Sequence, residues 1–327
     1  MNKNILVTGT RRSGTTFLGR MLSVKKEISY IHEPFNRNQG VKSHVIDRWY
    51  ISPENLDMVE FDKIVDKLIN RKKVETRVSF GDVHGNDLKF DVSFSCRIMN
   101  LIKNYSSESL IKRFGKIFFK NRFYLTYLKT RLNYFYERLL IKDPFLALMS
   151  EHLLKKFDFK IIFIIRHPAA FYNSMKKREW YIKKNNFMKS EQIVEKHFKN
   201  VNLLEGFKKN EEKIIMEYVI VNKILTDIAK KNNIYVVRLE DIGTDPLKEF
   251  KQIYEYLDIP FTKRVRRKVI AHTKNNNTNS GSLSDIKRDS AATIDRWKKE
   301  LSLEEKDFIK RRTYQYFKEK YPAETWK

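Results

Sequence analysis

The feature that most constrains this chain lies at its N-terminus, where a short apolar run leads into a polar turn and then into helical periodicity. Ile5-Leu6-Val7 has the character of a buried strand, and Thr8 to Thr16 follows as a turn that contains glycine. The next apolar residues recur at the spacing of one helix face: Phe17, Leu18, Met21 and Leu22. A strand, a glycine-containing turn and a helix in this order are typical of the opening of a nucleotide-binding α/β fold.

Three further apolar runs are predicted to be strands of the same sheet: 139–141, 160–165 and 234–237. The second run is free of charge after Lys160, which is typical of a parallel strand buried on both faces. Pro168 suits the first turn of the helix that follows it. Strands that alternate with helices predict an α/β fold of three layers, α/β/α, around a mainly parallel central sheet.

Residues 40–138 show weaker periodicity than the segments on either side. We predict a single domain over 1–327, with 40–138 as a variable, largely helical insert. The aromatic and basic stretch 117–138 is interpreted as a core helix overlaid by lysine and arginine side chains, with a membrane- or acceptor-binding face as the alternative. Near the C-terminus, 275–284 is expected to be a loop, and Ser302 the N-cap of a last helix over 303–320.

Charge narrows the range of partners. Lys and Arg number 66 and Asp and Glu number 40, which gives a net charge of +26. This surplus favours an anionic nucleotide, an acidic glycan, a nucleic acid or a membrane surface, although lysine and asparagine are frequent along the whole chain. Cys96 is the single cysteine, and the seven histidines lack metal-ligand spacing, so neither a disulfide nor a metal is expected. No secretory signal precedes the first strand, so a cytoplasmic protein is expected.

The turn Thr10–Thr16 is the first candidate site. Its backbone N–H groups are expected to converge on an anion, because the turn opens a helix. Gly14 lets the backbone approach a phosphate closely, and Thr15 and Thr16 add hydroxyl donors. The Gly-Lys-Ser/Thr ending of a Walker loop is absent, which disfavours a nucleotide kinase or an ATP- or GTP-hydrolysing enzyme.

A second candidate site follows the strand that ends at Arg166. Ser174 lies eight residues later, on the predicted helix. A guanidinium offers phosphate oxygens a fixed fork of donors, and a hydroxyl carried by a helix adds another donor. Arg166 with Ser174 is therefore a second candidate site for phosphate oxygens.

Both segments resemble those of sulfotransferases that use 3′-phosphoadenosine-5′-phosphosulfate (PAPS). Thr10–Thr16 resembles their 5′-phosphosulfate loop, and Arg166 with Ser174 resembles the pair that holds the 3′-phosphate. Further similar segments cover much of the chain outside 40–138: Lys142-Asp143-Pro144-Phe145, Leu239-Glu240-Asp241 and Asp295-Arg296-Trp297-Lys298. The motifs are most similar to those of carbohydrate, tyrosylprotein and bacterial members, and imply the P-loop-like sulfotransferase fold with a helical insert.

The resemblance implies that the enzyme moves the sulfuryl group of PAPS to an acceptor hydroxyl and releases 3′,5′-ADP, with Arg12 neutralising charge on the leaving oxygen. The residues it implies for PAPS binding come from both motifs and one later segment: Arg11, Arg12, Ser13, Gly14, Thr15, Thr16, Phe17, Arg166, Ser174 and Arg288. Two features depart from the family. Leu239 stands where a tyrosine is often found for adenine stacking, and the C-terminal Arg-Lys-Gly motif is absent, for which Arg288 with Ser290 is the candidate substitute.

The general base is expected within Ile31-His32-Glu33-Pro34-Phe35. Tyrosylprotein and several bacterial or carbohydrate members use a glutamate in this region, which assigns the role to Glu33. A carboxylate beside a basic nucleotide pocket stays ionised and can take a proton from the acceptor hydroxyl. His32, whose ordinary pKa is near neutrality, is the competing candidate.

The expected acceptor is a hydroxyl of a polysaccharide, oligosaccharide or glycolipid, because the positive charge suits an acidic glycan. A tyrosylprotein or small-phenol acceptor is the alternative, favoured by the Lys142-Asp143-Pro144-Phe145 likeness. A basic nucleic-acid-binding protein would also explain the charge, but no recognition motif is present, so no specific nucleic acid is expected. Residues 36–138 and 179–210 are the segments expected to form the acceptor site; no pattern predicts the oligomeric state.

Overall fold

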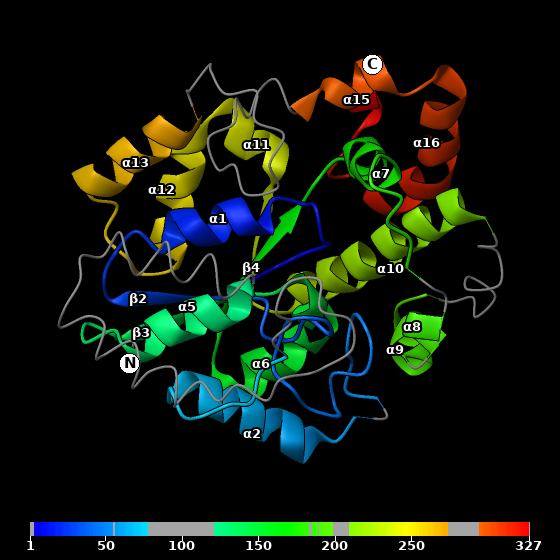
Figure 1. The fold of residues 1–327 in the computed structure, drawn as a ribbon. Coiled ribbons are helices and arrows are strands. Elements are labelled where there is room, and N and C mark those ends of the chain that lie inside the picture. The colour runs from blue at the N-terminus through cyan, green and yellow to red at the C-terminus, as the bar shows by residue number, and fades with distance from the viewer. Residues whose placement is uncertain are drawn as a thin grey trace.

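The computed structural model describes residues 3–54, 56–77, 121–182, 185–188, 190–198, 209–273 and 294–326. Within these ranges the centre of the molecule is a five-stranded sheet in which every pairing is parallel, in the order β2-β3-β1-β4-β5 (Figure 1). The strands are β1 Ile5–Thr8, β2 Ile28–His32, β3 Arg138–Lys142, β4 Lys160–Ile165 and β5 Tyr235–Arg238. The predicted α/β class and all four predicted strands are confirmed, and β2 was not predicted.

Helices cover both faces of the sheet, because successive side chains of each strand point to opposite sides and both sets are apolar. Ile5 and Val7 of β1 pack on one face with helices α1, α12 and α13, whereas Leu6 belongs to the core on the other face. Helices α1, α12 and α13 lie together on one side of the strands in Figure 1. The helices of the first face are α1 Thr15–Leu22, α11 Leu239–Thr244, α12 Pro246–Tyr256 and α13 Lys263–Thr273. The three-layer arrangement follows from this alternation.

The second face carries a larger set of helices. They are α2 Met58–Ile69, α5 Arg122–Arg131, η1 Pro144–Met149, α6 Ser150–Phe157, α7 Pro168–Lys176, α9 Glu191–His197, α10 Asn210–Lys231, α15 Arg296–Glu300, α16 Leu303–Phe317 and η3 Ala323–Trp326, with the short α8 Asn185–Met188 beside α9. Helix α10 spans 22 residues and packs against α7 and α16. One charged residue, Glu217, is fully buried on α10.

The predicted insert 40–138 is described in part, because residues 78–120 lie outside the described residues. Its described segments include helices α2 and α5. Phe123, Tyr124 and Tyr127 of α5 are buried in the core, as interpreted for the aromatic core helix, but the helix ends at Arg131, and Tyr134 and Phe135 of the same predicted stretch are exposed. That the chain is a single domain remains a prediction.

The C-terminal helix α16 begins as predicted. The Ser302 hydroxyl accepts a hydrogen bond from the Glu305 N–H at 3.2 Å, and the Glu305 side chain accepts from the Ser302 N–H. The helix ends at Phe317, three residues before the predicted end. The predicted loop 275–284 lies outside the described residues.

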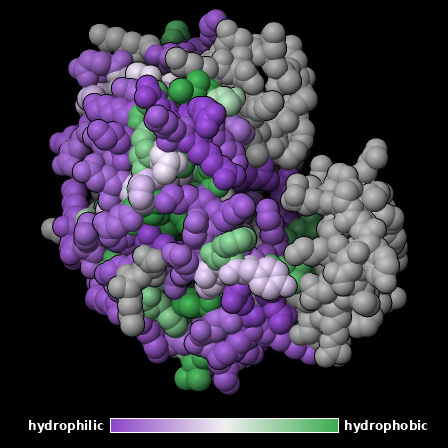
Figure 2. All heavy atoms as spheres, turned by 90° about the vertical axis from the view of Figure 1, so that its left-hand side faces the viewer, coloured by the Kyte–Doolittle hydropathy of each residue, from purple (hydrophilic) through white to green (hydrophobic). Residues whose placement is uncertain are grey.

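The surface is strongly hydrophilic on the side shown in Figure 2, where only small hydrophobic patches interrupt the polar residues. Helix α13 contributes exposed cations to the surface: Lys263, Arg264, Arg266, Arg267 and Lys268. Among the described helices, none combines the length and the apolar character that crossing a membrane would need.

Candidate active site

The loop between β1 and α1 (residues 9–14) lies at the edge where all five described strands have their carboxyl ends. Its shape depends on two glycines in the left-handed region, Gly9 with φ 147° and Gly14 with φ 101°. A Cβ atom on Gly9 would lie 2.3 Å from the carbonyl oxygen of Ile164, and one on Gly14 would lie 2.8 Å from a methyl carbon of Leu239. Side chains are therefore excluded at both positions, by backbone conformation and by contact with neighbouring elements.

The β1–α1 loop directs its polar groups in two ways. The Ser13 hydroxyl donates to the Thr10 carbonyl at 2.5 Å and is buried, so it fixes the turn from inside. Thr15 and Thr16 open helix α1, whose first turn carries no acidic residue. The first N–H groups of a helix have no partner within the helix, and together with the helix dipole they make this end of α1 favourable for an anion. Phe17, a predicted ligand of the nucleotide, packs edge-on against Phe250, with ring centroids 6.0 Å apart.

The structure brings the two sequence motifs into direct contact. Arg12, at φ 66°, donates from Nε to the Ser174 hydroxyl at 3.1 Å. Arg166, directly after β4, donates from its guanidinium to the Arg12 carbonyl, also at 3.1 Å. Two guanidinium groups and a hydroxyl from segments over 150 residues apart in sequence thus meet at one place. Arg288, the remaining predicted ligand, and its neighbour Ser290 lie outside the described residues.

Arg11 points to helix α10. Its guanidinium forms a two-point ion pair with Glu217, with Nε–Oε1 and Nη2–Oε2 distances of 2.8 Å. The Tyr50 hydroxyl donates to the same carboxylate at 2.7 Å. Although burial opposes it, this carboxylate raises the pKa of Arg11 above its usual value. Sequence reasoning assigned Arg11 to the nucleotide, and the structure instead engages its side chain in a buried ion pair.

Glu33, the predicted base, follows directly after β2 and has φ 49°. Its N–H donates to the Lys142 carbonyl at 2.8 Å, which ties it to the end of β3. Its carboxylate is paired with the Lys142 ammonium and accepts from Asn36 Nδ2 at 2.8 Å. Burial alone would raise the pKa of Glu33, but the adjacent ammonium lowers it to about 2. Glu33 is therefore ionised at neutral pH, and 18% of its side chain stays exposed.

His32 is a neutral neighbour of Glu33. Burial lowers the pKa of His32 to about 3, and nearby cations act in the same direction against the opposing charge of Glu33. Its Nδ1 lies 2.8 Å from the Tyr30 hydroxyl, and its Nε2 lies 3.7 Å from a Glu33 oxygen. With the phenol proton donated to Nδ1, the ring carries its own proton on Nε2, facing Glu33.

Asp143 holds the segment after Glu33 in place. Its carboxylate accepts from the Phe35 N–H at 2.7 Å and from the Phe145 N–H at 2.9 Å. Burial, with the nearby negative charge of Glu33, raises the pKa of Asp143 to about 7. The side chain therefore joins the loop after β2 to the start of η1, which fixes the relative position of Glu33 and Lys142.

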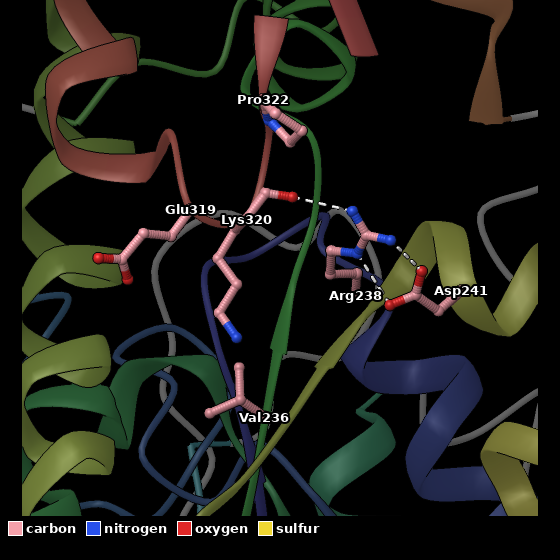
Figure 3. A pocket seen from close by; sticks show the side chains of 6 residues that line it. All are labelled: Val236, Arg238, Asp241, Glu319, Lys320 and Pro322. Carbon is pink, nitrogen blue, oxygen red and sulfur yellow. Dashed lines mark hydrogen bonds and ion pairs between the residues drawn. The ribbon is translucent and has the colours of Figure 1, made fainter. Parts of the chain in front are cut away.

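A separate cavity of about 350 Å³ lies beside β5. Figure 3 shows its lining, which consists of Val236, Arg238, Asp241, Glu319, Lys320 and Pro322. Arg238 donates to the Asp241 carboxylate and to the Lys320 carbonyl, so its donors are engaged within the protein. None of the predicted site residues lines this cavity. The described part of the chain contains no group of three or more His, Cys, Asp or Glu side chains that could hold a metal ion.

A match to a known protein family covers the residues described above. The model of the Sulfotransferase family matches residues 4–263, a span that includes the β1–α1 loop, Glu33, Lys142, Arg166 and Ser174. The chain belongs to the sulfotransferase family.

Two curated relatives share shorter or weaker similarity with this sulfotransferase family member. Carbohydrate sulfotransferase 1 of Rattus norvegicus is 35% identical over 72 residues, which is 22% of this chain and 18% of the relative. The MATH and LRR domain-containing protein PFE0570w of Plasmodium falciparum is 24% identical over 242 residues, which is 73% of this chain and 2% of the relative. The chain thus matches less than a fifth of the length of either relative.

Two solved structures have a low similarity. Sulfotransferase STF9 from Mycobacterium avium is 14% identical with a TM-score of 0.44, over 97% of this chain and 76% of that chain. Mouse sulfotransferase SULT7A1 complexed with PAP is 10% identical with a TM-score of 0.46, over 100% of this chain and 87% of that chain.

Sequence reasoning on this sulfotransferase missed two site residues, Lys142 and Glu217. Each had a local signal. Lys142 is a cation at the end of the apolar run Leu139–Ile141, and only 3% of its side chain is exposed. Glu217 interrupts the apolar stretch 214–221 of α10. A charge within or beside a buried apolar run predicts a buried partner, because an unpaired buried charge is costly.

Proposed function

We propose that this chain transfers the sulfuryl group of PAPS to a hydroxyl of a carbohydrate acceptor and releases 3′,5′-ADP. The observation that carries this proposal is the meeting of Arg12, Ser174 and Arg166 at the β1–α1 loop. Backbone N–H groups of the loop, with Thr15 and Thr16, would hold the 5′-phosphosulfate. Arg166 and Ser174 would hold the 3′-phosphate, because a guanidinium and a hydroxyl together suit phosphate oxygens.

The proposed reaction is an in-line substitution at sulfur. Glu33 accepts the proton of the acceptor hydroxyl while that oxygen forms a bond to sulfur. The bond between sulfur and the 5′-phosphate oxygen breaks, and 3′,5′-ADP leaves with the electron pair. Arg12 stabilises the charge that develops on that leaving oxygen, which is electrostatic stabilisation aimed at the transition state.

In this mechanism the Lys142 ammonium would interact with both the sulfuryl donor and Glu33. With the Lys142 ammonium beside it, Glu33 is ionised but holds a proton weakly, because its pKa lies at about 2. A sulfuryl oxygen within reach of Lys142 would share the ammonium and so raise the pKa of Glu33. Glu33 would then gain strength as a base when the donor is present, which restricts proton transfer to the productive complex.

A carbohydrate acceptor is supported by two observations. The local similarity to a carbohydrate sulfotransferase covers 72 residues at 35% identity. The net charge of +26 favours the approach of an acidic glycan. The Lys142-Asp143-Pro144-Phe145 segment favours a tyrosine or phenol hydroxyl instead, so both acceptor classes belong in the first turnover screen with labelled PAPS.

The experiment that tests the donor is a calorimetric titration with 3′,5′-ADP, with 5′-AMP and ATP as controls. We expect tight binding that requires the 3′-phosphate, and loss of that preference in Arg166→Ala. Equal affinity of the wild type for 3′,5′-ADP and 5′-AMP would overturn the PAPS assignment. Salt-sensitive binding of nucleic acid, without turnover of PAPS, would favour the nucleic-acid-binding alternative.

A further inference from the structure

Trp180 is an exposed tryptophan beside the candidate site. It is 38% exposed, and the other exposed large hydrophobic side chains of the described residues are Val59, Tyr134, Phe135 and Leu303. Among these five, Trp180 alone lies within cation–π range of a residue of the β1–α1 loop, since the Arg11 guanidinium is 5.7 Å from its ring centroid. An exposed large aromatic ring beside a reaction site is a candidate contact for a substrate.

The backbone holds Trp180 in a fixed position. Helix α7, which carries Ser174, ends at Lys176, and the Trp180 N–H donates back to the Met175 carbonyl at 3.3 Å. Glu179, the preceding residue, has φ 52°, a left-handed conformation that side chains other than glycine rarely adopt. Ile182 is buried two residues later. The exposed ring is thus presented by a constrained turn between two buried anchors, and strain of this kind is concentrated at functional sites.

Two guanidinium groups flank the ring, and they differ in how they are held. Arg11 is fixed by its two-point ion pair with Glu217. Arg178 lies 5.6 Å from the ring centroid and forms no ion pair with a described residue. Both distances exceed the roughly 3.5–4 Å of direct stacking, so neither group is in face-to-face contact with the indole. The ring therefore keeps accessible area, and beside it lies the Arg178 guanidinium, which pairs with no acidic side chain of the described residues.

We propose that Trp180 is the stacking platform of the acceptor site for the pyranose ring of a glycan, and that Arg178 pairs with a carboxylate or sulfate of the same glycan. This inference rests on the proposed function and adds the acceptor's chemistry to it. The C–H face of a pyranose buries its apolar area on an aromatic ring while its hydroxyls stay hydrated. The Arg11 guanidinium, 5.7 Å from the ring centroid, would place the bound sugar near a residue of the loop that would hold the sulfuryl donor.

The charge of Arg178 favours an acidic glycan over adenine as the group that stacks on Trp180. Adenine is uncharged, and the phosphates of the nucleotide are assigned to the β1–α1 loop and to Arg166 with Ser174, so a base stacked on Trp180 would not itself supply Arg178 with a counter-charge. An acidic sugar supplies both an apolar ring face and an anion at short range from it. The pair Trp180 and Arg178 therefore fits an acidic glycan better than a nucleobase.

The test is a binding measurement in the presence of saturating 3′,5′-ADP, so that turnover is not required. The probes are oligosaccharides of chondroitin and heparosan, which carry uronic acids, with chito-oligosaccharides as neutral sugars and a tyrosine peptide and 4-nitrophenol as other acceptors. We expect Trp180→Ala to weaken binding of the acidic oligosaccharides on the order of tenfold, and Trp180→Phe to retain most of it. Arg178→Gln should weaken binding of the acidic sugars and leave that of neutral sugars unchanged.

The matched control is Leu303→Ala, which removes a large hydrophobic side chain that is 81% exposed at the start of α16, outside the segments expected to form the acceptor site. It should leave the affinity for every probe unchanged. A lower affinity of Trp180→Ala for 3′,5′-ADP would place adenine on the ring and overturn the inference. Binding of 3′,5′-ADP without binding of any of these glycans, or with binding of only the peptide or the phenol, would overturn it as well. Failure of the wild type to bind 3′,5′-ADP would instead remove the proposed function itself.

Discussion

Two carboxylates of the candidate site, one buried and one partly exposed, are each paired with a cation, and they differ in how much of the carboxylate the partners occupy. Glu217 is fully buried, and Arg11 contacts both of its oxygens while Tyr50 adds a third hydrogen bond. Glu33 keeps 18% of its side chain exposed, and the Lys142 ammonium pairs with one oxygen only. The first carboxylate is closed to a further partner, whereas the second can be reached by one.

The difference follows from the chemistry of the two cations. A guanidinium is a planar fork that matches both oxygens of a carboxylate, so Arg11 saturates Glu217. An ammonium is a compact point charge, so Lys142 can hold Glu33 through one oxygen and leave the other to the neutral amide of Asn36. The comparison assigns a structural role to the Arg11 pair and a reactive role to the Lys142 pair.

The largest expected effect is on turnover in Glu33→Gln. Loss of the proposed general base should lower kcat by about 10²–10⁴-fold, because the amide cannot accept the acceptor's proton. Affinity for 3′,5′-ADP, measured by calorimetry, should stay within about twofold, since a single isosteric change away from the nucleotide alters ΔG by a few tenths of a kcal/mol. Full activity of Glu33→Gln would show that another residue is the base and would contradict the reactive role proposed for Glu33.

The corresponding change at the Arg11–Glu217 pair should lower the stability of the fold. Glu217→Leu leaves the buried Arg11 guanidinium without its partner, which is expected to cost about 3–5 kcal/mol of unfolding free energy. The double variant Arg11→Met with Glu217→Leu should recover most of that loss, because it removes both charges. Denaturant unfolding of the three proteins tests this. Unchanged stability in the single variant would contradict the assigned structural role.

Lys142→Met should change the pH dependence. Without the ammonium, burial raises the pKa of Glu33, so the acid limb of the kcat profile should move to higher pH by about 1–3 units. The lowered pKa of Glu33 stabilises the wild type above the ordinary value of about 4.3, and this stability is lost as pH falls through the folded value. The stability advantage of the wild type over the variant should therefore shrink between about pH 5 and 2. A difference that stays constant with pH would show that the pair is not ionic.

The smallest effects are expected for the two neutral hydrogen-bond donors, Tyr50 beside Glu217 and Asn36 beside Glu33. Tyr50→Phe removes one bond to Glu217 and should lower stability by about 1.5 kcal/mol without changing kcat. Asn36→Ala removes one bond to Glu33 and should change kcat by less than about tenfold, with little loss of stability. Thermal unfolding and initial rates on both variants separate the two outcomes. A fall in kcat for Tyr50→Phe with stability unchanged would reverse the assignment.

The parts of the fold that could be predicted are those whose signal is local. The apolar runs at 5–7 and 160–165 match buried parallel strands, and Ser302 caps its helix through a residue three positions away. Strand β2 was missed because Ser29, Tyr30 and His32 break its apolar pattern, while pairing with β3 still orders its backbone. Tertiary pairing here overrides a weak local preference.

The candidate site was predictable where one motif contains the chemistry, as in the β1–α1 loop. The partners of its side chains were not, because they come from distant elements. Arg11 and Glu217 are 206 residues apart, and the Lys142 ammonium reaches Glu33 across 109 residues. Sequence alone therefore named Arg11 as a ligand of the nucleotide, when its most direct contact is a carboxylate of α10.

The central position of β1 in the sheet determines when its contacts can form during folding. Leu6 pairs with Ile141 on one side and with Ile161 on the other, so β1 gains its first neighbour only when β3 has been synthesised and its second only with β4. The long chain between these strands must be brought together before the strand contacts can form, and the entropy that this costs slows folding. We expect β1 amides to become protected from hydrogen exchange together with those of β4, so the β1–α1 loop would acquire its shape late in folding.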